Sequence, residues 1–218
     1  MNKNVEQLTE TMLKNYESRF VCNDLTDLVL EGFPRSGNTF SVDCLRYLNK
    51  SRNLNIAHHT HSFRNLILGV ELGVPSVALI RNPLEAISSY MIYSGRNVDA
   101  ATKYYYEFYF SLMDFKDLIS FIKFEDVVTD MNEVIQKLNE KYSLNLNVSD
   151  NIKRDSEVIK NMDVERAKKT RTAEEFIKTV GVPTKERDLL KNEIKQDVNT
   201  HLSENSKVTE LYEEIISP

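Results

Sequence analysis

The sequence predicts an α/β fold, a three-layer sandwich with a central, mostly parallel sheet and a helical C-terminal part. Short apolar segments alternate with helical patterns up to about residue 147, which is typical of parallel strands joined by helical crossovers. From about Val148 onward the strand signals vanish, and charged helical patterns continue to the end. The 218 residues are enough for one domain with a substantial core.

The first strand is expected at residues 27–31 (DLVLE), a short apolar run that ends at Gly32. After a loop, apolar residues at mostly helical spacing predict a helix that Asn49 and Lys50 close. A second strand is expected at 56–59. A helix follows at 61–72, because its apolar residues share one helical face.

The clearest strand is 76–80 (SVALI), a continuous apolar run of the kind found in central parallel strands. We expect Asn82 to cap the next helix, with Pro83 at its first position and Glu85 as a capping-box carboxylate. The aromatic stretch 103–110 is expected to pack in the core. A fourth strand at 119–124 and an amphipathic helix at 127–138 complete the α/β part.

We therefore expect a single domain, 1–218, in three parts. They are an N-terminal helical segment (1–24), an α/β core (25–147), and a helical cover with C-terminal helices (148–218). In the last part, the basic and polar stretch 160–179 is expected to cover the site. A break at 180–183 precedes one helix at 184–203 and another in the last dozen residues.

Composition limits the function classes. The net charge of −5 argues against a general binder of nucleic acid or anionic membranes. No apolar run approaches the roughly 20 residues that a membrane helix needs, and the polar N-terminus does not resemble a signal peptide. Two cysteines, Cys22 and Cys44, make a disulfide framework improbable and favour reduced thiols in a cytoplasmic protein.

Residues 32–39 (GFPRSGNT) have the spacing of the phosphate-binding loop G-x-x-x-x-G-K-[ST], but Asn38 replaces the lysine and Arg35 lies inside the loop. The glycines and backbone N–H groups of such a loop hold an anion at a helix N-terminus. The missing lysine is the group that serves the β- and γ-phosphates of a triphosphate. The core is therefore expected to bind a phosphorylated nucleotide without acting as an ordinary ATPase or kinase.

Three polar groups follow three of the predicted strands. They are the loop from Arg35 to Thr39, the segment 58–61 (HHTH), and Arg81 with Ser88 and Ser89 two turns into the next helix. Ligands of open α/β sheets bind at the carboxyl ends of the strands, so we expect the three groups to form one site.

These motifs resemble those of sulfotransferases that use 3′-phosphoadenosine-5′-phosphosulfate (PAPS). Segment 34–40 (PRSGNTF) resembles the family's 5′-phosphosulfate loop. Arg81-Asn82-Pro83 with Ser89 resembles its 3′-phosphate motif, and His59-Thr60-His61 resembles the segment that carries its general base. Residues 124–126 (FED) resemble a fourth motif, and the likeness spans roughly residues 28–140. The sequence departs from the family at Asn38, where a second threonine is usual. The family's Arg-Lys-Gly segment, which completes the 3′-phosphate site, is also not intact in this chain.

The resemblance implies a P-loop-like fold and a transfer of the sulfuryl group to a hydroxyl or amine, with PAPS as donor and no metal. It implies that His61 is the base, with His59 as the alternative, and that Arg35 stabilises the leaving phosphate. The cofactor-binding residues it implies are Arg35, Ser36, Gly37, Asn38, Thr39, Phe40, Arg81 and Ser89, with Lys168, Lys169 and Arg171 as further candidates.

Two alternatives stay open at this point. One is a nucleotide or nucleoside kinase with a degenerate loop, against which the missing lysine and the arginine after strand 76–80 both argue. The other is a non-catalytic nucleotide-binding module. The sequence favours a small molecule or a glycan as acceptor, and it leaves the acceptor's identity and the oligomeric state open.

Overall fold

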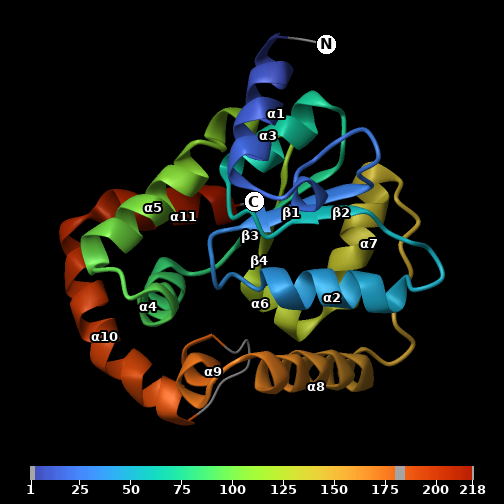
Figure 1. Cartoon of the computed structure of the whole chain (residues 1–218). Coiled ribbons are helices and arrows are strands. Elements are labelled where there is room, and N and C mark those ends of the chain that lie inside the picture. The colour runs from blue at the N-terminus through green and yellow to red at the C-terminus, as the bar shows by residue number, and fades with distance from the viewer. Residues whose placement is uncertain (1–2, 180–184, 218) are drawn as a thin grey trace.

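Four parallel strands form the centre of the molecule in the computed structural model, which describes residues 3–179 and 185–217. The strands are β1 (Leu28–Gly32), β2 (Ile56–His58), β3 (Ser76–Ile80) and β4 (Ser120–Lys123). They lie side by side in the order β2-β1-β3-β4, and every neighbouring pair is parallel (Figure 1). The predicted α/β class is confirmed, and the sheet is parallel throughout the described residues.

Alternate residues of the strands enter two separate hydrophobic cores, one on each face of the sheet. Val29, Ala78 and Ile80 point into one core, whereas Leu28, Leu30, Val77 and Leu79 point into the other. Helices α1 (Lys3–Asn15), α3 (Phe63–Glu71) and α5 (Val98–Phe110) cover the first face, and α2 (Asn38–Leu48) and α7 (Met131–Tyr142) cover the second. This is the predicted three-layer arrangement.

All the elements that the structure describes after residue 147 are helices. They are α8 (Ile152–Thr170), α9 (Ala173–Thr179), α10 (Lys185–Glu204) and α11 (Ser206–Ile216). Helix α8 runs below α2 in Figure 1, and α10 passes α4 (Pro83–Ser94) to reach α11. Apolar residues of α10 and α11 join the first core. The predicted break at 180–183 lies outside the described residues.

Two local expectations were wrong. The predicted helix 127–138 is two helices, α6 (Phe124–Thr129) and α7, because the Asp130 side chain caps α7 by accepting hydrogen bonds from Asn132 N at 3.0 Å and Glu133 N at 3.3 Å. Asn82 caps α4 as expected, with Pro83 at its first position. Glu85, however, does not complete a capping box; it forms ion pairs with Lys191 and Lys195 of α10.

The aromatic helix α5 packs in the core, as expected, and also reaches the carboxyl ends of the strands. Tyr105, Phe108 and Tyr109 are fully buried. Tyr105 Oη donates to the carbonyl of Arg81 at 2.7 Å, and Tyr109 Oη donates to that of Leu79 at 2.7 Å. The helix therefore fixes the backbone at the end of β3, where the candidate site begins. Two short 3-10 turns, η1 (Ser18–Phe20) and η2 (Met113–Phe115), complete the described elements.

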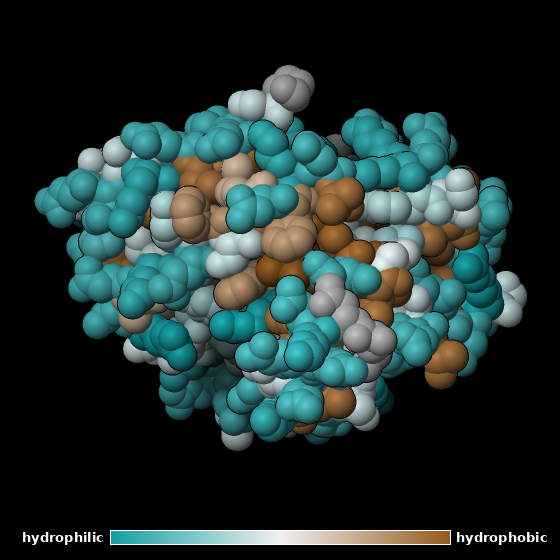
Figure 2. Space-filling view, turned by 90° about the horizontal axis from the view of Figure 1, so that it is seen from above, coloured by the Kyte–Doolittle hydropathy of each residue, from teal (hydrophilic) through white to brown (hydrophobic). Residues whose placement is uncertain are grey.

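Cys22 and Cys44 are both free and buried. Burial raises the pKa of the Cys22 thiol to about 11 and that of Cys44 to about 12, so both stay protonated at neutral pH. None of the helices in residues 3–179 and 185–217 is long and apolar enough to cross a membrane. Figure 2 shows the face seen from above, where apolar side chains gather near the centre within a hydrophilic rim.

Candidate functional site

The loop between β1 and α2 has the geometry of an anion cradle. Gly37 has φ 91°, and a Cβ there would lie 3.0 Å from the Phe124 ring. A Cβ on Gly32 would lie 2.5 Å from the carbonyl oxygen of Leu79. Glycine is therefore required at both positions. Helix α2 starts immediately after Gly37, so the N–H groups of its first turn, which have no partner inside the helix, border the loop.

Asn38, which stands in place of the usual lysine, folds back into the loop. Its Nδ2 donates to the carbonyl of Phe33 at 3.3 Å and approaches that of Gly32 at 3.5 Å, and the residue is buried. Ser36 is also buried. Phe40 packs partly against the second core, with the Lys160 ammonium 5.8 Å from its ring centre. The side chains of Asn38 and Phe40 therefore support the loop.

Arg35 joins the loop to the helix that follows β3. Its Nε donates to Ser89 Oγ at 3.3 Å, and its Nη1 donates to the carbonyl of Thr179 at 2.9 Å. The guanidinium also lies 5.7 Å from the ring centre of Tyr93. In the other direction, Arg81 Nη1 donates to the carbonyl of Arg35 at 3.0 Å. Two of the three polar groups that the sequence singled out thus contact each other directly.

Arg81 is largely buried, with 17% of its side chain exposed, and it lies 4.0 Å over the ring of Phe124. Burial lowers the pKa of its guanidinium. Its Nε is buried and has no hydrogen-bond partner within the described ranges 3–179 and 185–217. A buried donor without a partner is costly, so this position favours an anionic ligand.

Lys191 and Lys195 share the carboxylate of Glu85 with Arg81. The sequence motifs did not predict these two lysines. Glu85 lies 3.7 Å from Arg81 Nη2 and forms ion pairs with both lysines. These contacts lower the pKa of Glu85, although its burial alone would raise it. Three cations thus surround one carboxylate. No local motif marks the two lysines, since they lie about a hundred residues further along the chain.

The histidine segment after β2 is held by Glu31, a fully buried carboxylate in β1. Glu31 Oε1 accepts hydrogen bonds from Thr60 N at 2.9 Å, Thr60 Oγ1 at 2.6 Å and Asn65 Nδ2 at 3.0 Å, and its Oε2 accepts one from His61 N at 3.0 Å. His59 and His61 have φ values of 63° and 49°. These bonds hold both histidines in the left-handed region of backbone conformation. The helix expected from residue 61 therefore begins only at Phe63.

His61 has one ring nitrogen available as a proton acceptor. Its Nδ1 lies 2.9 Å from the carbonyl oxygen of Gly32. Because a carbonyl can only accept, Nδ1 carries the proton of the neutral ring, and the lone pair is on Nε2. Tyr104 Oη donates to the backbone carbonyl of His61 at 2.6 Å and fixes the segment from the other side. The neutral ring is therefore a base at Nε2.

His59 has the opposite arrangement. Arg46 Nη2 donates to His58 Nε2 at 3.0 Å, so His58 carries its proton on Nδ1 and donates to Nδ1 of His59. His59 must then hold its proton on Nε2, which donates to Thr39 Oγ1 at 3.1 Å. Burial lowers the pKa of His58 to about 3 and that of His59 to about 4, so both rings are neutral. His59 thus acts as a donor to the loop and not as a free base.

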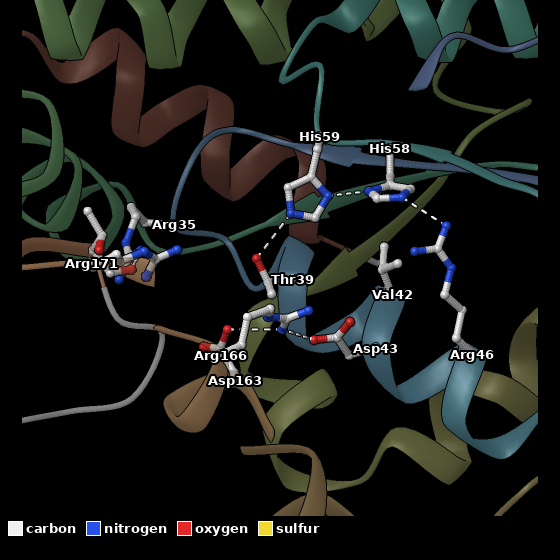
Figure 3. Close-up of a pocket in the computed structure, with 11 residues that line it drawn as sticks. Arg35, Thr39, Val42, Asp43, Arg46, His58, His59, Asp163, Arg166 and Arg171 are labelled. Carbon is white, nitrogen blue, oxygen red and sulfur yellow. Dashed lines mark hydrogen bonds and ion pairs between the residues drawn. The ribbon is translucent and has the colours of Figure 1, made fainter. Parts of the chain in front are cut away.

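A pocket of about 250 Å³ opens beside the loop (Figure 3). Its lining residues come from the loop, α2, the histidine segment, α8 and the stretch around α9; they are Arg35, Thr39, Val42, Asp43, Arg46, His58, His59, Asp163, Arg166, Arg171 and Thr179. Figure 3 shows Arg35 and Arg171 at one end and Arg46 and His58 at the other. His61 does not line it, although its ring centre lies 5.9 Å from that of His59.

The basic candidates of α8 and its end have different environments. Arg171 lines the pocket beside Arg35. Lys168 forms an exposed ion pair with Glu165 at 2.9 Å, and Lys169 is exposed. Their assignment to the nucleotide stays a prediction.

One solved structure, that of mouse sulfotransferase SULT7A1 complexed with PAP, is similar to this chain with a TM-score of 0.56 and 13% sequence identity. The similarity covers 97% of this chain and 88% of the mouse chain. No family model and no curated protein sequence matches the chain. This likeness shows that the chain has the sulfotransferase fold, as the sequence motifs implied.

We predict that Glu31→Ala destabilises the protein by on the order of 3 kcal/mol, because it leaves the buried donors of Thr60, His61 and Asn65 without an acceptor. The free energy of unfolding is measured by urea denaturation. Glu31→Gln, which keeps one acceptor oxygen, should lose less, and the exposed Glu140→Ala serves as control. Equal stability of Glu31→Ala and the unmodified protein would contradict this role.

We also predict that His58 and His59 stay neutral down to about pH 5, since burial lowers their pKa values to about 3 and 4. Nuclear magnetic resonance of the imidazole carbon-bound protons, assigned with single His→Gln variants, measures this directly. The two rings should show no titration shift between pH 8 and pH 5. A midpoint near pH 6.5 for either ring would disprove the proton arrangement given above.

Proposed function

We propose that this protein transfers a sulfuryl group from PAPS to a hydroxyl or amine of a small-molecule or glycan acceptor. The observation that carries the proposal is the direct contact between the two anion-binding motifs. Arg35 of the loop bonds to Ser89, and Arg81 bonds to the backbone of Arg35. This pairing suits a ligand with an anion at each of two nearby positions, as in a nucleotide with both 5′- and 3′-phosphates.

The loop supplies the site for the 5′-phosphosulfate. Its N–H groups and the hydroxyl of Thr39 are donors. Because His59 donates to Thr39 Oγ1, the Thr39 proton is left to point toward a ligand. Arg35 is always cationic and offers several donors, so it stabilises the charge that builds on the bridging oxygen of the leaving nucleotide. Asn38, Ser36 and Gly37 give the loop its shape.

Arg81 and Ser89 supply the site for the 3′-phosphate. Arg81 has a buried Nε without a partner in the described part of the chain, and Ser89 offers a hydroxyl. Lys191 and Lys195 add positive charge beside Arg81 and complete the site in this proposal. Arg171, beside Arg35, is the second choice, ahead of the exposed Lys168 and Lys169.

His61 takes the acceptor's proton on Nε2, the ring nitrogen that its bond to Gly32 leaves unprotonated. PAPS supplies the sulfuryl group, whose bond to the bridging oxygen breaks as the acceptor oxygen or nitrogen bonds to sulfur. Such a step needs no divalent cation. In agreement, the residue that follows β3 is Arg81, where a nucleoside triphosphatase places an acidic residue for magnesium. The two buried free thiols suit the cytoplasm, where we place the protein.

We predict that the protein binds 3′-phosphoadenosine-5′-phosphate without metal and that Arg81→Ala weakens this binding at least tenfold, because a charge-assisted contact is lost. Isothermal titration calorimetry measures it. The matched control is Arg64→Ala, which removes an arginine of α3 outside the loop and the 3′-phosphate site. If the bisphosphate gives no binding signal and magnesium-ATP binds, the proposal is overturned in favour of a kinase. Binding without turnover on a broad acceptor panel would favour a non-catalytic module.

We expect His61→Ala to lower kcat by about 100-fold or more, since it removes the general base. The bisphosphate should bind His61→Ala within about twofold of the unmodified protein, because the loop is intact. His59→Ala is the matched control and should weaken donor binding more than it slows turnover of the bound complex. If His59→Ala lowers kcat with bisphosphate binding intact, and His61→Ala mainly weakens donor binding, then His59 is the base.

A further inference from the structure

The pocket beside the loop lies on the side of β2, away from the proposed 3′-phosphate site. Apart from Arg35 of the loop, its described lining comes from α2, His58 and His59 at and just after the end of β2, α8, and residues 171 and 179. None comes from β3 or α4. Arg81 and Ser89 lie at the end of β3 and on α4. Arg35 borders both regions. A PAPS molecule that extends from the loop toward Arg81 would therefore leave the β2 side of the pocket open to a second molecule.

The lining of this pocket is polar. Among the described residues that line it, Val42 is the one apolar residue. Asp43, Asp163 and Thr39 offer groups that bond to hydroxyls. A flat apolar acceptor, such as a phenol or a steroid, would bury few apolar contacts here and would remove charged groups from water at a cost. The pocket suits a molecule with several hydroxyl groups.

The described residues that line the pocket carry unequal charges, with four arginines against two aspartates. Arg166 forms ion pairs with both aspartates, at 2.5 Å from Asp43 and 3.1 Å from Asp163. Arg46, at the far end in Figure 3, donates to the imidazole of His58, which is neutral. Within the described residues Arg46 forms no ion pair with a carboxylate. The end of the pocket farthest from Arg35 therefore carries an unbalanced positive charge.

We infer that this pocket receives the acceptor and that the acceptor is a hydroxylated acid, such as a uronic-acid sugar, whose carboxylate pairs with Arg46. This inference rests on the proposed sulfotransferase function. Arg46 is a guanidinium at the pocket rim, and its planar donors match a carboxylate. With the acid held at that end, the hydroxyls extend past His59 toward Arg35 and the neighbouring ring of His61.

Calorimetric titration of the full chain with glucuronate and with glucose tests the inference, each alone and with saturating 3′-phosphoadenosine-5′-phosphate. We expect glucuronate to bind at least tenfold more tightly than glucose under both conditions. Arg46→Gln should abolish this preference and leave the affinity for the bisphosphate within about twofold, whereas Arg46→Lys should keep most of the preference. Lys50→Gln, four residues further along the chain, just after the end of α2 and outside the pocket, is the charge-matched control and should behave like the unmodified protein.

Three results would overturn the inference. Equal affinity for glucose and glucuronate would show that the pocket has no acid site. Displacement of glucuronate by the bisphosphate would show that the pocket belongs to the donor. Equal losses of glucuronate and bisphosphate affinity in Arg46→Gln would show that Arg46 acts through His58, His59 and Thr39 on the loop. If the bisphosphate does not bind at all but Arg46-dependent glucuronate binding persists, the sulfotransferase function fails and the acid site stands.

Discussion

The buried carboxylate of Glu31 is the interaction on which the arrangement of the site depends. It accepts hydrogen bonds from Thr60, His61 and Asn65, and Asn65 in turn bonds to the backbone of Phe20 and Cys22. One side chain of β1 thereby joins the histidine segment, α3 and the N-terminal segment. Burial raises the pKa of Glu31, while these donors and His61 oppose the rise. A carboxylate with several donors is tolerated where an isolated one is not.

A second carboxylate, Glu85, connects the α/β core to the C-terminal helices. It pairs with Arg81 at the end of β3 and with Lys191 and Lys195 of α10. The helical part thus supplies charge to the sheet edge in addition to covering it. The likeness to the mouse sulfotransferase extends over 97% of this chain, so both the sheet and the helices belong to the shared fold.

Local patterns predicted the features that depend on neighbouring residues. The strand 76–80, the cap at Asn82 and the glycine loop are of this kind. The role of Glu31 was not predictable, because its partners lie about thirty residues further along the chain. The preference for His61 over His59 came from a family motif. The different placement of the protons on the two rings appears only when Gly32, Arg46 and His58 are placed around them.

Four carbonyl oxygens of the loop between β1 and α2 have partners within the protein. His61 bonds to that of Gly32, Asn38 to that of Phe33, Arg81 to that of Arg35, and Ser41 to that of Gly37. These four oxygens are occupied, and the N–H donors of the loop remain as groups that can bind an anion. A loop fastened at four oxygens also has little conformational entropy left to lose when an anion arrives. For the proposed function, this means that the loop's preference for anions is built into the unliganded chain, and that little of the ligand's binding energy is needed to order the backbone.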